Sequence, residues 1–144
     1  MPASSTVTVK GLDGSEVVFT LEQLKRMPQQ SASIMNPHRN AKENYEGVLL
    51  RELLAKVKAP AGEQLRGADM ADYVDVMGSD RYHAVFALAE LDSAFQDNQV
   101  LLAITSDGKP LPANVGPMRL VAPQDKRPAR SVRMVTTITL RRAP

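Results

Sequence analysis

A basic, proline-stiffened loop between two alternating runs constrains the fold of this chain more than any other feature. Residues 118–122 and 132–139 each place apolar side chains at every second position, which is typical of β-strands. Between these runs lie Lys126, Arg127 and Arg130, together with Pro128, whose ring restricts φ and removes a ladder donor. The stretch therefore predicts two short strands joined by a loop that gathers several cations.

Length and composition predict a single domain over residues 1–144 with an ordinary buried core. The chain has 144 residues, 43% of them hydrophobic and 24% charged. It contains no apolar run of 18 residues, which argues against a membrane-spanning helix. A net charge of +2 and 4% aromatic residues give little support to nucleic-acid binding. Cysteine is absent, which excludes disulfides and thiolate chemistry from these residues.

The remaining patterns predict a mixed α+β domain with short strands and short helices. Residues 6–10 and 16–19 read as strands around an Asp13-Gly14 turn. Thr20 and Gln23 have the spacing of a capping box, which predicts a helix from residue 21. Leucines at spacings of three and four predict a helix over 48–57, and residues 36–44 read as a polar loop. The apolar run 100–105 predicts a central strand.

The basic loop has two interpretations on its residues alone. In the first, it is a solvated connection whose cations pair with local acids such as Asp125. In the second, it binds an anion or a polar heterocycle, because Arg offers a planar fork of donors and Lys a point charge. Spacing does not separate these two interpretations.

Several motifs resemble the molybdopterin-binding domain of the sulfite oxidase family. The run GPMRLVAPQDKRPARSVRMV, residues 116–135, is similar to the family's Gly-Pro-(Leu/Met)-Arg-Leu-Val-x-Pro-Gly stretch and the Ala-Arg-Ser-Val-Lys pattern after it. Residues 45–54, 79–82 and 107–111 resemble its helix start and two of its turns. The resemblance covers about residues 6 to 140 and implies the same mixed α+β fold.

The resemblance also implies a pocket for a pterin, such as molybdopterin or another reduced pterin. Chemically, Asp, Ser and backbone groups can bind the edge of a pterin, and a cationic cluster can bind a phosphate. The positions that match the family's pocket are Asp80, Tyr82, Asp125, Lys126, Arg127, Arg130, Ser131 and Arg133, with His38 and Arg39 as further candidates from the polar loop. We expect replacement of Arg130 by Ala to abolish pterin retention.

One departure from the family affects the metal. Catalytic members bind molybdenum through a cysteine near Met35 and Asn36, and this chain has no cysteine to replace it. A soft thiolate suits such a metal better than an amide or a thioether does. We therefore expect a pterin bound without molybdenum and no catalytic residues, which argues against an enzyme.

Three functions follow as hypotheses. The first is non-catalytic pterin binding, and the resemblance implies that such a domain acts as an exported, periplasmic sensor for a membrane signalling protein. The second is a molybdopterin-dependent oxidoreductase, the usual activity of the family. The third is a protein-interaction domain with a vestigial pocket, in which apolar side chains would fill the cavity while a retained pocket would keep Arg130 and Asp80 pointing inward.

Overall fold

The computed structural model describes residues 6–36 and 40–144 and consists mainly of two five-stranded sheets. The helices are short: α1 (Leu21–Arg26), α2 (Leu50–Ala55) and the 3-10 turns η1 (Gly62–Gln64), η2 (Gly67–Ala71), η3 (Leu88–Leu91) and η4 (Pro128–Arg130). This confirms the predicted α+β class. Among the described residues, no helix is long and apolar enough to span a membrane.

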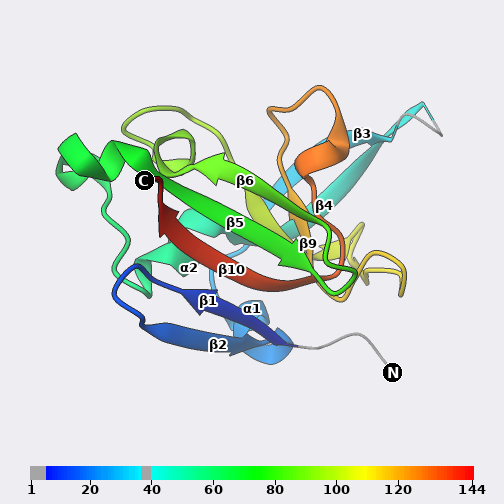
Figure 1. Ribbon diagram of the computed structural model, residues 1–144. Helices are drawn as coiled ribbons and strands as arrows, with labels where there is room; N and C mark the ends of the chain where they lie inside the picture. Colours follow the sequence, from blue (N-terminus) through cyan, green and yellow to red (C-terminus); the bar gives the residue numbers. More distant parts are fainter. Residues whose placement is uncertain (1–5, 37–39) are drawn as a thin grey trace.

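The first sheet has the strand order β2-β1-β10-β5-β6 and is seen across the front of Figure 1. Its strands are β1 (Thr6–Lys10), β2 (Glu16–Thr20), β5 (Asp72–Gly78), β6 (His83–Ala87) and β10 (Val135–Arg142). The pair β1 and β10 is parallel, whereas the other neighbours are antiparallel, so this sheet is mixed. Strand β10 therefore joins two hairpins that are far apart in sequence.

The second sheet carries the residues that matter below. Its strands are β3 (Gln30–Asn36), β4 (Ala41–Leu49), β7 (Leu101–Ser106), β8 (Lys109–Pro110) and β9 (Arg119–Val121). Strand β7 lies between β4 on one edge and β8 and β9 on the other, as the apolar run 100–105 predicts. In Figure 1, β3 and β4 extend together away from the first sheet.

Two apolar clusters hold these sheets together. The larger one combines residues of both sheets with Leu24 of α1 and Leu50, Leu53 and Leu54 of α2. The smaller one lies against the second sheet and consists of Ile34, Tyr45, Ala103, Leu111 and Val121. Helix α1 begins with the predicted capping box, because the Thr20 hydroxyl accepts a hydrogen bond from the Gln23 amide and the Gln23 side chain accepts one from the Thr20 amide.

Two predicted boundaries are wrong because strand pairing extends β4: residues 41–44 pair with β3, and residues 45–49 pair with β7. Strand β4 begins at Ala41 and continues to Leu49, so it takes the end of the predicted polar loop and the start of the predicted helix. Val48 and Leu49 are buried as strand residues opposite Leu102 and Leu101. Tertiary pairing with β7 thus overrides the helical spacing of the leucines, and the helix keeps only Leu50–Ala55.

The predicted strand over 132–139 is also displaced. Met134 adopts a positive φ of 52°, a conformation that a strand does not tolerate, and β10 begins one residue later. A register shift between Val135 and Thr137 then puts Val135 and Ile138 into the core, three positions apart. Arg133 consequently lies in the connection before β10 and takes no part in the strand pairing of β10.

Candidate functional site

A polar groove of about 480 Å³ lies at the end of the second sheet, beside the smaller apolar cluster. We call it the arginine groove. Its lining combines four cations, two carboxylates and several neutral groups: Asn36, Ala41, Lys42, Glu43, Tyr45, Ser106, Asp107, Lys109, Pro110, Pro112, Asn114, Val115, Arg119 and Arg133. Its size lies within the range that binds small organic ligands, about 300–1,000 Å³.

Arg119 lies at the base of the arginine groove and is only 5% exposed. Strand β9 places it opposite Ala103 of β7, in the same sheet as Tyr45 of β4. Its Nε donates to the Ser131 carbonyl at 3.2 Å, and its Nη1 donates to the Tyr45 hydroxyl at 2.7 Å. Among the described residues, no carboxylate lies within ion-pair distance of Arg119.

Tyr45 couples this buried arginine to an acid. Its hydroxyl accepts from Arg119 and donates to Glu43 Oε1 at 3.2 Å, and its ring centroid lies 5.4 Å from the guanidinium carbon. Burial raises the pKa of the Tyr45 hydroxyl, the nearby Arg119 charge opposing this only in part. Tyr45 therefore stays neutral at physiological pH and offers Arg119 a neutral hydrogen-bond acceptor rather than an anion.

Arg133 reaches the rim of the arginine groove because its backbone packs closely over Gly78 at the end of β5. A Cβ added to Gly78 would lie 2.3 Å from the Arg133 carbonyl oxygen, a clash with backbone that only glycine avoids. Hydrogen bonds from the Met134 amide to Val115 and from the Ser79 amide to Met134 hold the same connection. The conformation of the chain before β10 therefore places a predicted site residue, Arg133, in the lining of the arginine groove.

The arginine groove carries an excess of positive charge. Lys42, Lys109, Arg119 and Arg133 face only Glu43 and Asp107, which leaves a difference of two positive charges among the lining residues. None of the four cations forms an ion pair with a carboxylate in residues 6–36 or 40–144. Lys42, Lys109 and Arg133 are exposed, so only the buried Arg119 carries the cost of an uncompensated charge, which an anion would reduce.

Arg130, the central residue of the predicted site, has a different environment. Its five N–H groups form five hydrogen bonds, to Asp125 (2.8 and 2.8 Å), to Glu90 (2.9 and 3.3 Å) and to the Val85 carbonyl (3.1 Å). The guanidinium carbon also lies 4.3 Å from the centroid of the Phe86 ring. The hydrogen bonds, those to Asp125 first, raise the pKa of Arg130. We call this group of Arg130, Asp125, Glu90 and Phe86 the Arg130 clamp.

Three other predicted site residues, Ser131, Tyr82 and Asp80, form hydrogen bonds with the backbone. Ser131 is buried, where its hydroxyl accepts from the Ala122 amide and its carbonyl holds Arg119. Tyr82 donates from its hydroxyl to the Ala129 carbonyl, and the exposed Asp80 accepts from the Tyr82 amide at 3.1 Å. These contacts tie the turn between β5 and β6 to η4, and neither residue lines the arginine groove.

A second hollow of about 350 Å³, which we call the Gln124 cleft, adjoins the basic loop. It is lined by Ser33, Ile34, Met35, Lys42, Pro123, Gln124, Asp125, Lys126 and Pro128. Lys42 lines both this cleft and the arginine groove. Arg127 is exposed and lines neither hollow, and the predicted residues His38 and Arg39 lie outside the described residues.

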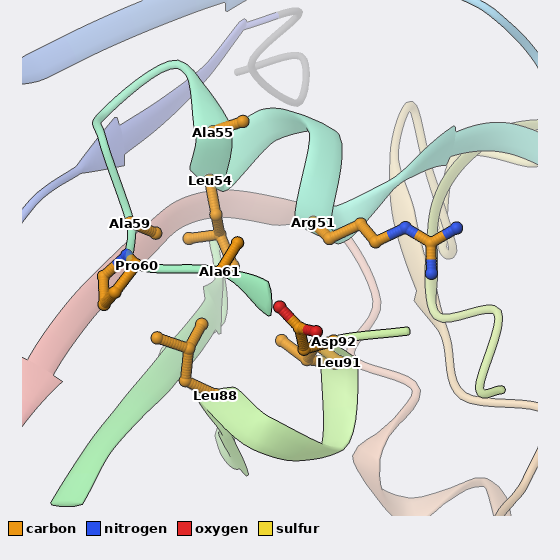
Figure 2. A pocket seen from close by; sticks show the side chains of 9 residues that line it. All are labelled: Arg51, Leu54, Ala55, Ala59, Pro60, Ala61, Leu88, Leu91 and Asp92. Atoms are coloured by element: carbon orange, nitrogen blue, oxygen red, sulfur yellow. The ribbon is translucent and has the colours of Figure 1, made fainter. Parts of the chain in front are cut away.

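A third hollow, between α2 and η3, is too small for an organic ligand. Figure 2 shows apolar side chains such as Leu54 and Leu88 around it, with Asp92 at its edge. Its volume of about 30 Å³ has room for little more than one water molecule. The Asp92 carboxylate accepts hydrogen bonds from the Gly62 and Ala94 amides, so it caps local backbone.

Sequence reasoning missed the residues that form the base of the arginine groove. Arg119 belongs to an alternating strand and to the family-like motif, but it is not among the site residues predicted from the sequence, and neither are Tyr45, Lys42 and Lys109. One signal was present: Arg119 is the single charged residue in the otherwise apolar run 115–122. A charge inside a buried strand usually has a partner or a ligand.

The donor set suits the organic part of a molybdopterin cofactor better than its metal. The unpaired cations and the groove volume fit a phosphate attached to a flat heterocycle. A protein thiolate cannot come from these 144 residues, because they include no cysteine. Residues 6–36 and 40–144 also contain no group of three or more His, Asp or Glu side chains that could hold a metal ion.

Comparison with known proteins agrees with this fold. The chain is similar over 96% of its length to the sulfane dehydrogenase SoxCD from Paracoccus pantotrophus, with 20% identity and a TM-score of 0.70. The matched part is 38% of the SoxCD chain, so the likeness shows the fold of one part of that protein. No curated protein matches the sequence. The family described as the oxidoreductase molybdopterin binding domain matches residues 1–144, and the chain therefore belongs to that family.

Proposed function

We propose that this chain binds a molybdopterin cofactor in the arginine groove and serves as the cofactor-binding domain of an oxidoreductase. The observation that carries the proposal is Arg119, a residue that is only 5% exposed and has no carboxylate partner in the described chain. An anionic ligand would compensate its charge. Family membership supplies the class of ligand.

In this proposal, the cations of the arginine groove bind the phosphate of the cofactor, and neighbouring residues hold Arg119 in place. Arg119 and Arg133 bind the phosphate from the base and the rim, and Lys42 and Lys109 add charge at longer range. Ser131 and Tyr45 hold the Arg119 guanidinium in place through the two hydrogen bonds described above. When bound, a molybdenum-loaded cofactor supplies two-electron redox chemistry.

Family membership favours the oxidoreductase hypothesis over the non-catalytic sensor. The absence of a cysteine bears on how a metal would be held, since the cofactor would have to retain it without a protein thiolate. Arg130 and Asp80, which a retained pocket is expected to point inward, do not line the arginine groove. Its lining is nevertheless polar, which argues against a pocket filled by apolar side chains. The periplasmic location and the membrane signalling partner remain predictions from the resemblance.

The test is the content of protein purified from a host that makes molybdopterin. The protein is denatured and oxidised, its pterin is measured by fluorescence, and molybdenum is measured on the same sample. We expect about one pterin per chain in the wild type and almost none in Arg119→Met. Stoichiometric molybdenum would support redox activity, and pterin without metal would support a domain that binds only the organic part.

A matched control is Arg66→Met, which removes an exposed arginine that does not line the groove. It should retain pterin like the wild type. Wild-type protein without pterin, even after incubation with the cofactor, would overturn the proposal.

A further inference from the structure

Strand β6 is an outer strand of the first sheet, so one of its two sides faces away from β5. The Gly78 amide donates to the Tyr82 carbonyl at the turn that joins the two strands. Because antiparallel partners alternate between bonded and non-bonded pairs, the even-numbered residues of β6 direct their backbone groups toward β5. The odd-numbered residues therefore direct theirs outward, where an outer strand is able to pair with another chain.

The Arg130 clamp occupies part of this outward edge. Arg130 Nη1 donates to the Val85 carbonyl at 3.1 Å, and Glu90 Oε1 accepts from the Ala87 amide at 2.9 Å. The two capping side chains are themselves joined, because Arg130 donates to both carboxylate oxygens of Glu90. A single ion pair thus takes one acceptor and one donor of the β6 edge.

The turn η4 lies beside the same edge and is held there by side chains. The Tyr82 hydroxyl donates to the Ala129 carbonyl, and the Arg130 guanidinium carbon lies 4.3 Å from the centroid of the Phe86 ring. Since these contacts involve no strand ladder, η4 is able to leave the edge while the pairing of β5 with β6 stays intact.

We infer that the Arg130 clamp and η4 close a pairing edge, and that β6 without this cover pairs with β6 of a second copy of this chain. The strand suits a two-fold, antiparallel joint centred on Val85. Val85, which is 48% exposed, would lie opposite its counterpart, and β-branched side chains form favourable cross-strand pairs. His83 would lie opposite Ala87, so no like charges would face each other across the joint.

The inference is independent of the proposed function, because no residue of the Arg130 clamp lines the arginine groove. It concerns self-association, which is measured on the full chain without a ligand. Pterin retention and the closure of the β6 edge are therefore able to fail separately.

The test measures the association constant by sedimentation velocity over a range of protein concentrations. The opened variant is Arg130→Met with Tyr82→Phe, which removes the side-chain hydrogen bonds that hold η4. We expect it to associate at least about tenfold more strongly than the wild type, the effect of about two net backbone hydrogen bonds. Arg127→Met, which removes an exposed arginine of the same loop, is the control and should behave like the wild type.

A proline at position 85 separates strand pairing from other forms of association. Val85→Pro removes an amide that points outward, so the β5 ladder keeps its hydrogen bonds while the outer edge loses its central donor. Added to the opened variant, Val85→Pro should return the association constant to the wild-type value.

Three results would overturn the inference. The first is wild-type association in an opened variant that retains its circular dichroism spectrum, and the second is added association that Val85→Pro leaves unchanged. The third is a wild type that already associates and becomes monomeric with Val85→Pro, because its edge would then be open. If the opened variant does not fold, Glu90→Ala, which frees the Ala87 amide, takes its place under the same criteria.

Discussion

Arg119 and Arg130 belong to the same motif-rich segment, yet they differ in how their charges are compensated. Arg130 uses all five N–H groups, with two carboxylates and one carbonyl as acceptors. Arg119 is more deeply buried and forms two hydrogen bonds, both to neutral acceptors. The comparison shows that the two arginines differ in their number of unused donors, which the density of charge along the sequence does not reveal. We use this difference to separate an arginine proposed to bind a ligand from one that stabilises the fold.

The largest expected effect follows from removing the uncompensated charge. In Arg119→Met, pterin affinity should fall about 100-fold or more, the range for a lost charge-assisted contact in an enclosed site. The ligand-free protein should remain folded, because an apolar side chain replaces a buried charge that has no carboxylate partner. Titration measures the predicted loss of pterin affinity, and thermal unfolding measures the predicted retention of stability. A large loss of stability with unchanged pterin binding would contradict the distinction between Arg119 and Arg130.

Removing the compensated charge should give the opposite result. Arg130→Met leaves Asp125 and Glu90 facing each other without their cation, and we expect the free energy of unfolding to fall by about 2 kcal/mol, reduced from the fully buried case by the partial exposure of Arg130. Pterin affinity measured well below the melting temperature should fall less than in Arg119→Met. Denaturant unfolding measures the change in the free energy of unfolding, and titration measures the pterin affinity.

The triple variant Arg130→Met, Asp125→Asn, Glu90→Gln sharpens this result. It removes the carboxylates together with their partner and should recover part of the lost stability. No recovery would mean that Arg130 stabilises the protein through its packing on Phe86 rather than through the carboxylates.

A smaller effect is expected at the exposed cations of the arginine groove. Lys109→Ala should weaken pterin binding about three- to fivefold at low salt, because Lys109 is exposed and screened by water. The loss should shrink at high ionic strength. Lys56→Ala, another exposed lysine outside the groove lining, is the control and should leave the titration unchanged.

The smallest effect concerns pH. Burial raises the pKa of Tyr45 above 10.0, its ordinary value, so the folded state holds the phenol proton more tightly than the unfolded state does. The resulting stability is fully present below pH 10 and decreases as pH rises through the higher folded pKa. Tyr45→Phe should flatten the alkaline part of the stability curve, measured between about pH 9 and pH 11. An equally steep decrease in the variant would assign it to other groups.

Much of the fold could be predicted from local patterns. The capping box at Thr20, the two strands β1 and β2 around the Asp13-Gly14 turn and the apolar run of β7 each depend on neighbours in sequence, and each is confirmed. The helix at 48–57 was overestimated, because pairing between β4 and β7 decides the state of Val48 and Leu49. Such pairing depends on residues more than fifty positions away, and the local spacing of apolar residues carries no information about them.

The candidate site was harder to predict for a similar reason. Counting cations along the chain leads to Lys126, Arg127 and Arg130, because they are close in sequence. One carboxylate that compensates Arg130, Asp125, is only five positions away, as the first interpretation of the loop predicts. The other, Glu90, is forty positions away, and Tyr45, the partner of Arg119, is 74 positions away. These distant contacts could not be read from the density of charge along the sequence.

The position of β10 has a consequence for how this domain assembles. Because β10 lies between β1 and β5, the hairpins β1–β2 and β5–β6 have no contact through the first sheet until this late segment takes its place. The parallel pair of β1 and β10 closes a loop of more than one hundred residues, a high contact order that slows folding. During synthesis on the ribosome, the edges of β1 and β5 that pair with β10 would therefore remain unpaired until β10 is made. We expect chaperones to bind mainly at β1 and β5 during this time.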